Sequence, residues 1–196
     1  MNIKLFLLSI WVPEFVLIQE LERTSNLTNE YLDRLLNRYS VTPPLVDTNL
    51  KGNFEERRMM MAAGHNLRVK ALVEALGSEK AMEAGRAEML KAGYKMGCDV
   101  RKRLGLGEDI NETMVAARIL YRVLGIKFTV EKRNKNIFMR VKSCALASSY
   151  TPQTCKIMSA ADEGVLKGLN EKMDLKFIKR ITEGAEECTA CVNIKN

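Results

Sequence analysis

Aromatic residues and histidine are scarce in this chain of 196 residues. Phenylalanine, tyrosine and tryptophan together make up 6% of it, and it contains one histidine. Few aromatic rings leave little material for stacking nucleic-acid bases. The formal charge is +7 at pH 7, but the lysines and arginines are spread along the chain rather than gathered in a block. Dispersed basic residues usually form a solvated surface, so we expect no specific nucleic-acid partner.

The chain also lacks a long hydrophobic run. Its longest N-terminal apolar stretch, residues 5–12, is too short to span a bilayer, and Pro13 and Glu14 follow where a spanning helix would continue. The residues around Trp11 do not supply the small side chains of a signal-peptide cleavage site. We therefore predict a core element or a partner-binding extension here, with membrane association through residues 3–18 as the less favoured alternative.

A paired set of cysteines is missing as well. The five cysteines are an odd number at irregular spacing, which argues against a disulfide framework and for a reducing, cytoplasmic location. Cys188 and Cys191 have the spacing of half a metal site. However, Cys188, Ala190 and Val192 alternate as in a strand, where residues three apart point to opposite faces. The two thiols could share one ion only if that strand broke or bulged.

Hydrophobic periodicity predicts an α+β fold in which long N-terminal helices pack on a mainly antiparallel sheet of about four strands, with a helix inserted between two hairpins. The expected helices are 27–38, 53–76, 79–104, 111–124 and 151–173, and the expected strands are 126–130, 137–141, 175–181 and 188–194. A turn is expected at 134–136. We divide the chain into an N-terminal extension and linker with one short helix, residues 1–53, and a single small-molecule domain, residues 54–196.

Several helical residues are unusual for their positions. Gly85, Gly93 and Gly97 each cost roughly 1 kcal/mol in a helix interior, which predicts tight helix packing in preference to room for a ligand. His65 falls on the apolar stripe of its helix. We predict a hydrogen-bonded core histidine there, with a metal-binding or catalytic role as the alternative.

The expected helix 151–173 carries a polar stripe. Cys155, Ser159 and Asp162 lie at positions i, i+4 and i+7 and so share one face. A thiolate can act as a nucleophile or metal ligand, and a carboxylate can take or give a proton. Without a local base, the residues alone favour the simpler interpretation, in which the cysteine is buried and the aspartate faces water.

These residues resemble a known pattern. Cys144 after a strand, Asp162 in a helix, and Thr182 with Gly184 and Cys188 across a hairpin look like the C-terminal pattern of the L-2-amino-thiazoline-4-carboxylic acid hydrolase family. The glycine comes one residue earlier than in that pattern. The position of the family's helical cysteine is occupied by Ser159, with Cys155 one turn before it.

The upstream half is similar to the related 4-vinyl-reductase domain family, in which a glycine-containing helix pair precedes a hairpin like 126–142. The resemblance implies a small hydrophobic ligand. It also implies, for some members, a zinc ion held by cysteines and a glutamate, for which Cys155, Glu183 and Cys188 are the nearest equivalents here.

The resemblance therefore implies a hydrolase-like protein acting on a C–N bond of a small heterocyclic or amide substrate. Cys155 or Cys144 would be nucleophile or metal ligand, Asp162 the acid/base, and Thr182 a positioning hydroxyl. The competing hypothesis is a non-catalytic ligand-binding or sensory domain that holds zinc and dimerises through its helices or N-terminal extension. A third is a structural subunit of a larger assembly, for which the apolar N-terminus is the evidence.

Overall fold

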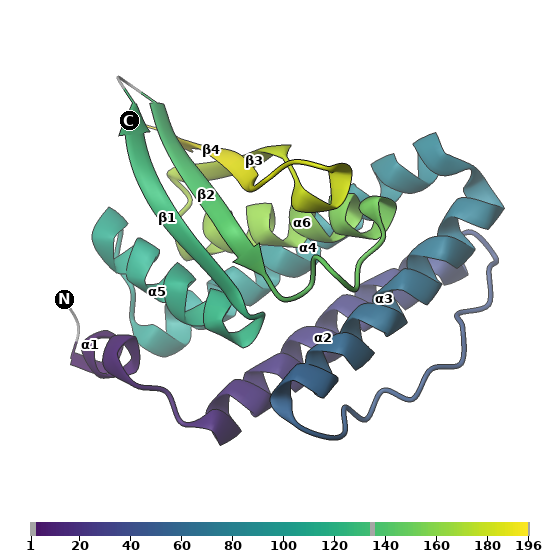
Figure 1. The fold of residues 1–196 in the computed structure, drawn as a ribbon, viewed down its shortest axis with the longest axis horizontal. Coiled ribbons are helices and arrows are strands. Elements are labelled where there is room, and N and C mark those ends of the chain that lie inside the picture. Colours follow the sequence, from purple (N-terminus) through teal and green to yellow (C-terminus); the bar gives the residue numbers. More distant parts are fainter. Residues whose placement is uncertain (1–2, 134–135, 196) are drawn as a thin grey trace.

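The computed structural model describes residues 3–133 and 136–195. Within these residues the chain forms six α-helices, one 3-10 turn and a four-stranded antiparallel sheet, so the predicted α+β class is confirmed (Figure 1). The helices are α1 (Ile3–Ile10), α2 (Glu14–Arg38), α3 (Phe54–Leu76), α4 (Ser78–Leu104), α5 (Ile110–Val123) and α6 (Pro152–Leu169). The strands and the turn are β1 (Ile126–Arg133), β2 (Asn136–Cys144), β3 (Met173–Lys179), η1 (Ile181–Glu183) and β4 (Cys188–Ile194).

The sheet has the strand order β1-β2-β4-β3. Helix α6 lies between β2 and β3 in sequence and packs on the sheet, which confirms the helix predicted between two hairpins. In β4 the side chains of Cys188, Ala190 and Val192 are buried, while those of Cys191 and Asn193 lie on the opposite face. The predicted separation of the two thiols is therefore correct. The predicted turn at 134–136 includes Asn134 and Lys135, which lie outside the described residues.

Helix α3 begins as its sequence predicts. The Asn53 side chain accepts hydrogen bonds from the backbone N–H groups of Glu55 and Glu56, and the Glu56 carboxylate accepts one from Asn53 N–H. This reciprocal pair is a capping box, which satisfies donors that the first helical turn leaves without partners. It fixes the start of the helix that carries His65.

Helix α6 ends four residues before the predicted boundary at Met173. Asn170 adopts an extended backbone, and its side-chain amide donates to the Glu108 carbonyl and to Thr113 Oγ1 at 3.0 and 3.2 Å. These long-range hydrogen bonds hold the residue outside the helix. Met173 is instead the first residue of β3, which ends at Lys179 rather than at Ile181.

The short helix predicted at 27–38 is wrong in length, because α2 begins at Glu14. Its buried stripe includes Ser25, Thr28 and Asn29, so the apolar periodicity is interrupted where the helix is in fact packed. Helix α2 packs on α3 and α4. The domain boundary after residue 53 stays a prediction.

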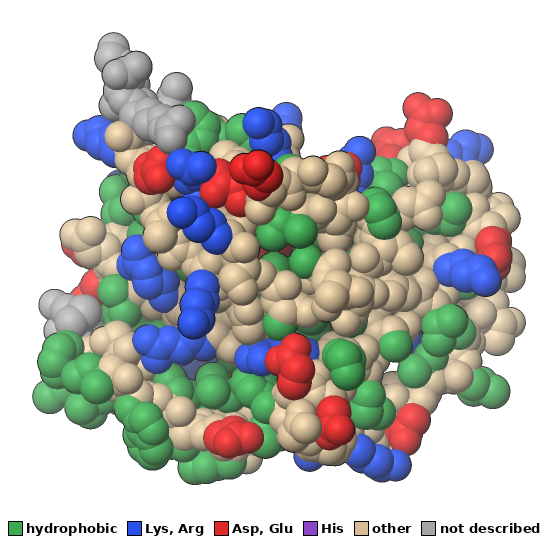
Figure 2. Space-filling view, viewed as in Figure 1, with side chains coloured by type: hydrophobic (Ala, Val, Ile, Leu, Met, Phe, Trp, Pro, Cys, Tyr) green, Lys and Arg blue, Asp and Glu red, His purple; other side chains and the backbone are tan. Residues whose placement is uncertain are grey.

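Helix α1 is apolar on both of its faces. Leu5 is fully buried, whereas Ile3, Leu7, Ile10 and Trp11 are each at least 60% exposed. Figure 2 shows hydrophobic side chains gathered at the lower left, where α1 lies in Figure 1. No helix within 3–133 or 136–195 combines the length and the hydropathy that crossing a membrane requires. Association of this segment with a membrane or partner stays a prediction.

The helix glycines serve close packing, as predicted. Helices α4 and α6 lie against each other, and a Cβ atom added to Gly93 or Gly97 would overlap the backbone of Ala161 or Val165. Gly164 and Gly168 on α6 are equally close to the backbone of α4. Since α6 carries the polar stripe, this contact fixes its position under the sheet.

Candidate functional site

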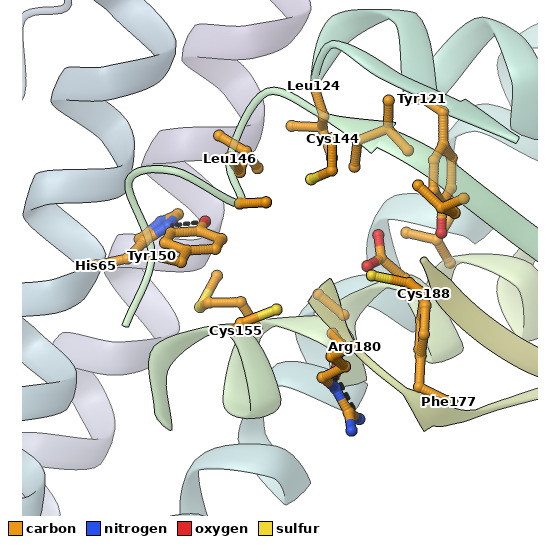
Figure 3. A pocket seen from close by; sticks show the side chains of 18 of the residues that line it. His65, Tyr121, Leu124, Cys144, Leu146, Tyr150, Cys155, Phe177, Arg180 and Cys188 are labelled. Atoms are coloured by element: carbon orange, nitrogen blue, oxygen red, sulfur yellow. Dashed lines mark hydrogen bonds between the residues drawn. The ribbon is translucent and has the colours of Figure 1, made fainter. Parts of the chain in front are cut away.

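A cavity of about 100 Å³ lies among α2, α3, α5, α6 and the inner face of the sheet. Figure 3 shows His65 and Tyr150 at one end, and Tyr121 and Cys188 at the other. Most of the wall is apolar, with side chains such as Met61, Met96, Leu120, Val141 and Phe177. Figure 2 shows a hollow bordered by hydrophobic side chains near the middle of the face it presents. A mostly apolar wall with a few polar groups is the usual form of a small-molecule site.

The structure brings together the residues predicted to be catalytic. Cys144 ends β2, Cys155 and Asp162 lie on α6, and Thr182 lies in η1, and all four line the cavity. Cys188 on β4 lines it as well. Their convergence follows from packing α6 beneath the ends of the strands. The chemical roles assigned to them stay predictions.

Asp162 is a carboxyl group whose neutral form is favoured by burial. Burial raises its pKa to about 7, and the Glu163 charge adds to this increase. The nearby Tyr121 hydroxyl and the Arg180 charge lower the pKa and so partly offset it. The side chain keeps some accessible surface because it borders the cavity, while protein surrounds its other sides. Among the described residues, no Lys, Arg or His forms an ion pair with it. A carboxyl group that titrates near pH 7 is suited to general acid–base work.

The thiols around the cavity are less acidic than ordinary cysteines. Burial raises the pKa of Cys144 to about 12. Burial also raises the pKa of Cys155, although the Thr182 hydroxyl and the Arg180 charge partly offset it. The pKa of Cys188 is raised by burial too, in spite of the hydrogen bond that its sulfur accepts from Ile181 N–H at 3.3 Å. All three are neutral thiols at pH 7 and hence weak nucleophiles.

Two hydroxyl groups at the cavity are available to a ligand. Tyr121 Oη and Thr182 Oγ1 are buried and, within the described part of the chain, have no partner at hydrogen-bond geometry. Both nevertheless lie close enough to a neighbour to change its pKa, Tyr121 to Asp162 and Thr182 to Cys155. Buried polar atoms without a partner are uncommon, and at a cavity wall they indicate a place where a bound molecule completes the hydrogen bonding.

His65 is a hydrogen-bonded core histidine, as predicted. Its Nε2 is 2.8 Å from Thr28 Oγ1, and its Nδ1 is 2.7 Å from Tyr150 Oη. Burial, with a smaller contribution from the Arg68 charge, lowers its pKa to about 3. The ring is therefore neutral at pH 7 and both of its nitrogens are engaged. It holds α2, α3 and the loop before α6 together at one end of the cavity.

Sequence reasoning missed Arg180. Its side chain is buried, and Nε and Nη2 both donate to Ser159 Oγ, at 3.2 and 3.0 Å. Nη1 donates to the Glu183 carboxylate at 3.3 Å. In Figure 3 its guanidinium group is directed away from the cavity. A shift of register after Phe177 places Arg180 beneath α6, and no local pattern distinguishes it from the other dispersed basic residues.

The metal prediction is not supported by the arrangement of side chains. Glu183 faces Arg180 and Lys156 and does not line the cavity with Cys155 and Cys188. Within the described ranges, no three His, Cys, Asp or Glu side chains are grouped so that they could hold a metal ion. The residues named for zinc thus do not fit a site in this structure, and zinc stays a prediction for metal analysis to test.

Comparison with solved structures found similar chains, of which a trafficking-complex subunit supports the fold. A trafficking protein particle complex subunit 3 from Naegleria fowleri, covalently bound to palmitic acid, is similar with a TM-score of 0.51 and 16% identity, over 71% of this chain and 95% of that one. The phenol-responsive sensory domain of the transcription activator PoxR, bound to phenol, has a TM-score of 0.49 and 17% identity, over 68% of this chain and 73% of that one. Comparison with curated proteins gave no match.

A family match covers most of the chain. Residues 56–192 match the family described as L-2-amino-thiazoline-4-carboxylic acid hydrolase. The matched range contains α3 to β4 almost entirely, and with them Cys144, Cys155, Asp162, Thr182 and Cys188. On this match, in agreement with the pattern seen in the sequence, the chain belongs to the L-2-amino-thiazoline-4-carboxylic acid hydrolase family.

Proposed function

We propose that the protein hydrolyses a C–N bond of a small heterocyclic or amide molecule bound in the cavity, with Asp162 as general acid and base. The observation that carries this proposal is a carboxyl group with a pKa of about 7 at the wall of an apolar cavity of about 100 Å³. Near neutral pH such a group is divided between its two protonation states, which serves both halves of a hydrolysis. Membership of the hydrolase family supports the reaction class.

In the proposed step the Asp162 carboxylate takes a proton from a water molecule while the water oxygen forms a bond to the substrate carbon. The C–N bond then breaks, and the protonated Asp162 returns that proton to the leaving nitrogen. One water molecule is consumed, with its hydroxyl on carbon and its hydrogen on nitrogen. Tyr121 and Thr182, whose hydroxyls lack partners among the described residues, would orient the substrate.

The cysteines have a secondary place in this proposal. Because burial raises the pKa values of Cys144 and Cys155, neither is an activated nucleophile on its own. Cys155 attacks only if a base removes its proton, and Asp162 on the same helix face is the group available for that. We therefore assign the principal role to Asp162 and a supporting one to Cys155, Cys144 and Thr182.

The test uses the heterocycle that gives the family its name, together with simple amides, and detects the product by its mass increase of one water. Asp162→Asn should lower the rate by roughly 10²–10⁴-fold, the usual contribution of a general acid or base. Cys155→Ala should lower it less. Cys191→Ala is the matched control, because Cys191 lies on the other face of β4, and it should leave the rate unchanged. An unaltered rate in a folded Asp162→Asn protein would remove Asp162 from the mechanism.

The second candidate is a non-catalytic ligand-binding or sensory domain. The neutral thiols and the apolar wall favour it, since they suit retention of a molecule as well as its conversion. A trafficking complex subunit of similar fold carries a covalently bound palmitic acid. A native mass spectrum showing a copurified small molecule, with no turnover of heterocycles or amides, would favour this function. A homodimer and a cytoplasmic location stay predictions.

A further inference from the structure

We propose that α1 and the turn after it insert a row of exposed apolar side chains into the surface of a lipid bilayer with anionic headgroups. This row, the α1 stripe, consists of Ile3, Phe6, Leu7, Ile10 and Trp11. None of these residues lines the cavity. The proposal therefore concerns a surface apart from the candidate catalytic site and does not depend on the reaction proposed for it.

The α1 stripe is continuous along the helix. Its first four members lie at positions i, i+3, i+4 and i+7, so they share one helical face. Trp11 extends the row, because its N–H donates to the Leu7 carbonyl as in a helix. The five side chains are between 46% and 74% exposed. A contiguous exposed apolar surface of this kind marks a site of interaction with a partner or a membrane.

Helix α1 is fixed to the rest of the protein. Leu5 lies on the face opposite the stripe and is fully buried in the main hydrophobic core. Helix α1 packs on α5, and Arg122 Nη2 on α5 donates to the Ser9 carbonyl at 2.7 Å. The stripe can therefore enter an apolar medium without unfolding of the helix or loss of its contact with the core.

Other exposed apolar side chains do not form a comparable row. Among the described residues, the remaining large ones lie singly or in pairs on different elements, and isolated exposed apolar residues are normal. They are Tyr39, Leu45, Met59, Leu67, Leu90, Tyr94, Ile110 and Ile178, while Phe15 follows the α1 stripe at the start of α2. The stripe is thus a distinct feature of the surface.

Basic side chains lie beside the α1 stripe. Lys4 is exposed on α1 and is the one charged residue in the sequence of 3–13. Arg118 and Arg122 are exposed one turn apart on α5, and their described contacts are with an aromatic ring and a backbone carbonyl rather than with carboxylates. Figure 2 shows Lys and Arg side chains next to the hydrophobic cluster at the lower left. Basic residues beside an apolar helical face attract anionic headgroups.

The dimensions of α1 suit the boundary of a bilayer rather than its interior. The helix has 8 residues, which at about 1.5 Å per residue gives about 12 Å, against a hydrocarbon core of about 30 Å. A helix of this length lies along the interface with its apolar face immersed. Tryptophan and lysine, here Trp11 and Lys4, are residue types that favour the level of the headgroups.

A second copy of the chain suits the α1 stripe less well than an anionic bilayer. In a two-fold contact the same surface of both protomers meets, so Lys4, Arg118 and Arg122 would lie near the same residues of the other copy. The chain carries a formal charge of +7. Like charges brought together oppose association, whereas anionic lipids attract the same residues.

The test measures binding of the full chain to lipid vesicles by flotation. One set of vesicles is phosphatidylcholine alone, and the other also contains about 30% phosphatidylserine. We expect at least about tenfold tighter binding to the anionic vesicles, and loss of most of this preference at about 1 M salt, where the Debye length falls to about 3 Å. No binding to the anionic vesicles, or equal binding to both sets at low salt, would overturn the proposal.

Trp11 provides an independent readout, because it is the one tryptophan in the chain. Its side chain is exposed in the free protein. Entry into the bilayer interface should shift its fluorescence emission to shorter wavelength, and lipids brominated near the headgroup end of the acyl chains should quench it. Vesicle binding without either change would mean that the stripe stays in water, which contradicts the proposal.

Two variants separate the apolar and the charge contributions. Leu7→Ser should weaken binding about tenfold, because it removes a side chain that would be buried in lipid. Arg118→Gln should weaken binding several-fold, and only to the anionic vesicles. The controls are Leu45→Ser, in the loop between α2 and α3, and Lys80→Gln, in the first turn of α4; both residues are exposed, and neither change should affect binding. Wild-type binding by a folded Leu7→Ser protein would overturn the proposal.

Sedimentation equilibrium tests whether a second copy covers the α1 stripe instead. A homodimer that Leu7→Ser dissociates, in a protein that does not bind vesicles, would show that the stripe is a subunit interface and would overturn the proposal. Because no described residue of α1 lines the cavity, Leu7→Ser should leave any hydrolysis unchanged. The membrane proposal and the hydrolase proposal therefore fail separately.

Discussion

Asp162 and His65 are both buried beside the same cavity, and burial shifts their pKa values in opposite directions. The pKa of Asp162 rises from 3.8 to about 7, and that of His65 falls from 6.5 to about 3. The folded state therefore holds a proton on Asp162 that the unfolded chain releases at lower pH, so this residue lowers the free energy of unfolding as pH rises from about 4 to 7. His65 acts in the opposite sense, because its contribution to stability is lost as pH falls from about 6.5 to 3.

We expect Asp162→Asn to stabilise the fold at about pH 8 and much less at about pH 4.5. Asparagine does not ionise, so the variant avoids a cost on the order of 4 kcal/mol that the wild-type protein bears above pH 7. Urea unfolding at the two pH values measures the difference. Asp174→Asn is the control, since ion pairs with Lys195 and Lys167 lower the Asp174 pKa and its removal should give no gain at pH 8. A gain of equal size at both pH values would contradict the explanation.

Individual site residues differ in how far the sequence predicts them. Cys155, Ser159 and Asp162 fall on one helical face, so their proximity follows from the 3.6-residue period alone. Arg180 and Tyr121 reach the same region from the segment after β3 and from α5, through a register shift and helix packing that no local pattern encodes. The shifted pKa values were equally inaccessible, because burial depends on every surrounding element.

At the scale of elements, the contact between α4 and α6 depends on glycine. Gly93→Ala should destabilise the protein by about 1–3 kcal/mol, because the added methyl group would overlap the Ala161 backbone and push α6 away from α4. Gly107→Ala is the matched control, since a Cβ atom there has no neighbour within 4 Å. A loss of about 2–4 °C in Tm per kcal/mol makes the effect visible in a thermal melt. Similar melting of the two variants would mean that this packing is not tight in solution.

Two leucines of helix α1, one buried and one exposed, provide a second pair of variants to compare. Leu5 is fully buried and packs in the same hydrophobic core as Val165 and Leu166, whereas Leu7 is 60% exposed. Leu5→Ala should cost about 2–5 kcal/mol, while Leu7→Ala should stay within about 0.5 kcal/mol of the wild type. Chemical unfolding of the two variants measures both. Equal, small effects would indicate that α1 is detached from the core in solution.

The elements themselves were predictable where one face is apolar and the other polar. Helix α5 and strand β4 follow that pattern, whereas α3 and α4 were predictable from the residues at their ends, Asn53, Gly77 and Gly105. The first half of α2 was missed because its buried stripe carries Ser25, whose hydroxyl accepts a hydrogen bond from the Asn29 side chain inside the bundle. Polar residues that are satisfied within the core look like a solvated face in the sequence.

At the scale of the whole molecule, the residues that line the cavity extend beyond the range that matches the family. The match begins at residue 56, yet Thr24 and Thr28 of α2 line the cavity, and Thr28 hydrogen-bonds to His65. Residues before 54 were predicted to be an extension and linker, outside the small-molecule domain. The α2 side chains therefore complete the wall of the cavity only if α2 folds together with residues 54–196.

We predict that α2 and residues 54–196 unfold together, because Leu21, Leu32, Leu35 and Leu36 on α2 are all at most 1% exposed and pack against α3, α4 and their connections. Hydrogen exchange of the full chain measures this directly. The most protected amides of α2 should open with the same free energy as those of α6 and β4. Protection confined to residues after 54 would show that α2 opens independently and that the first 53 residues are a separate extension.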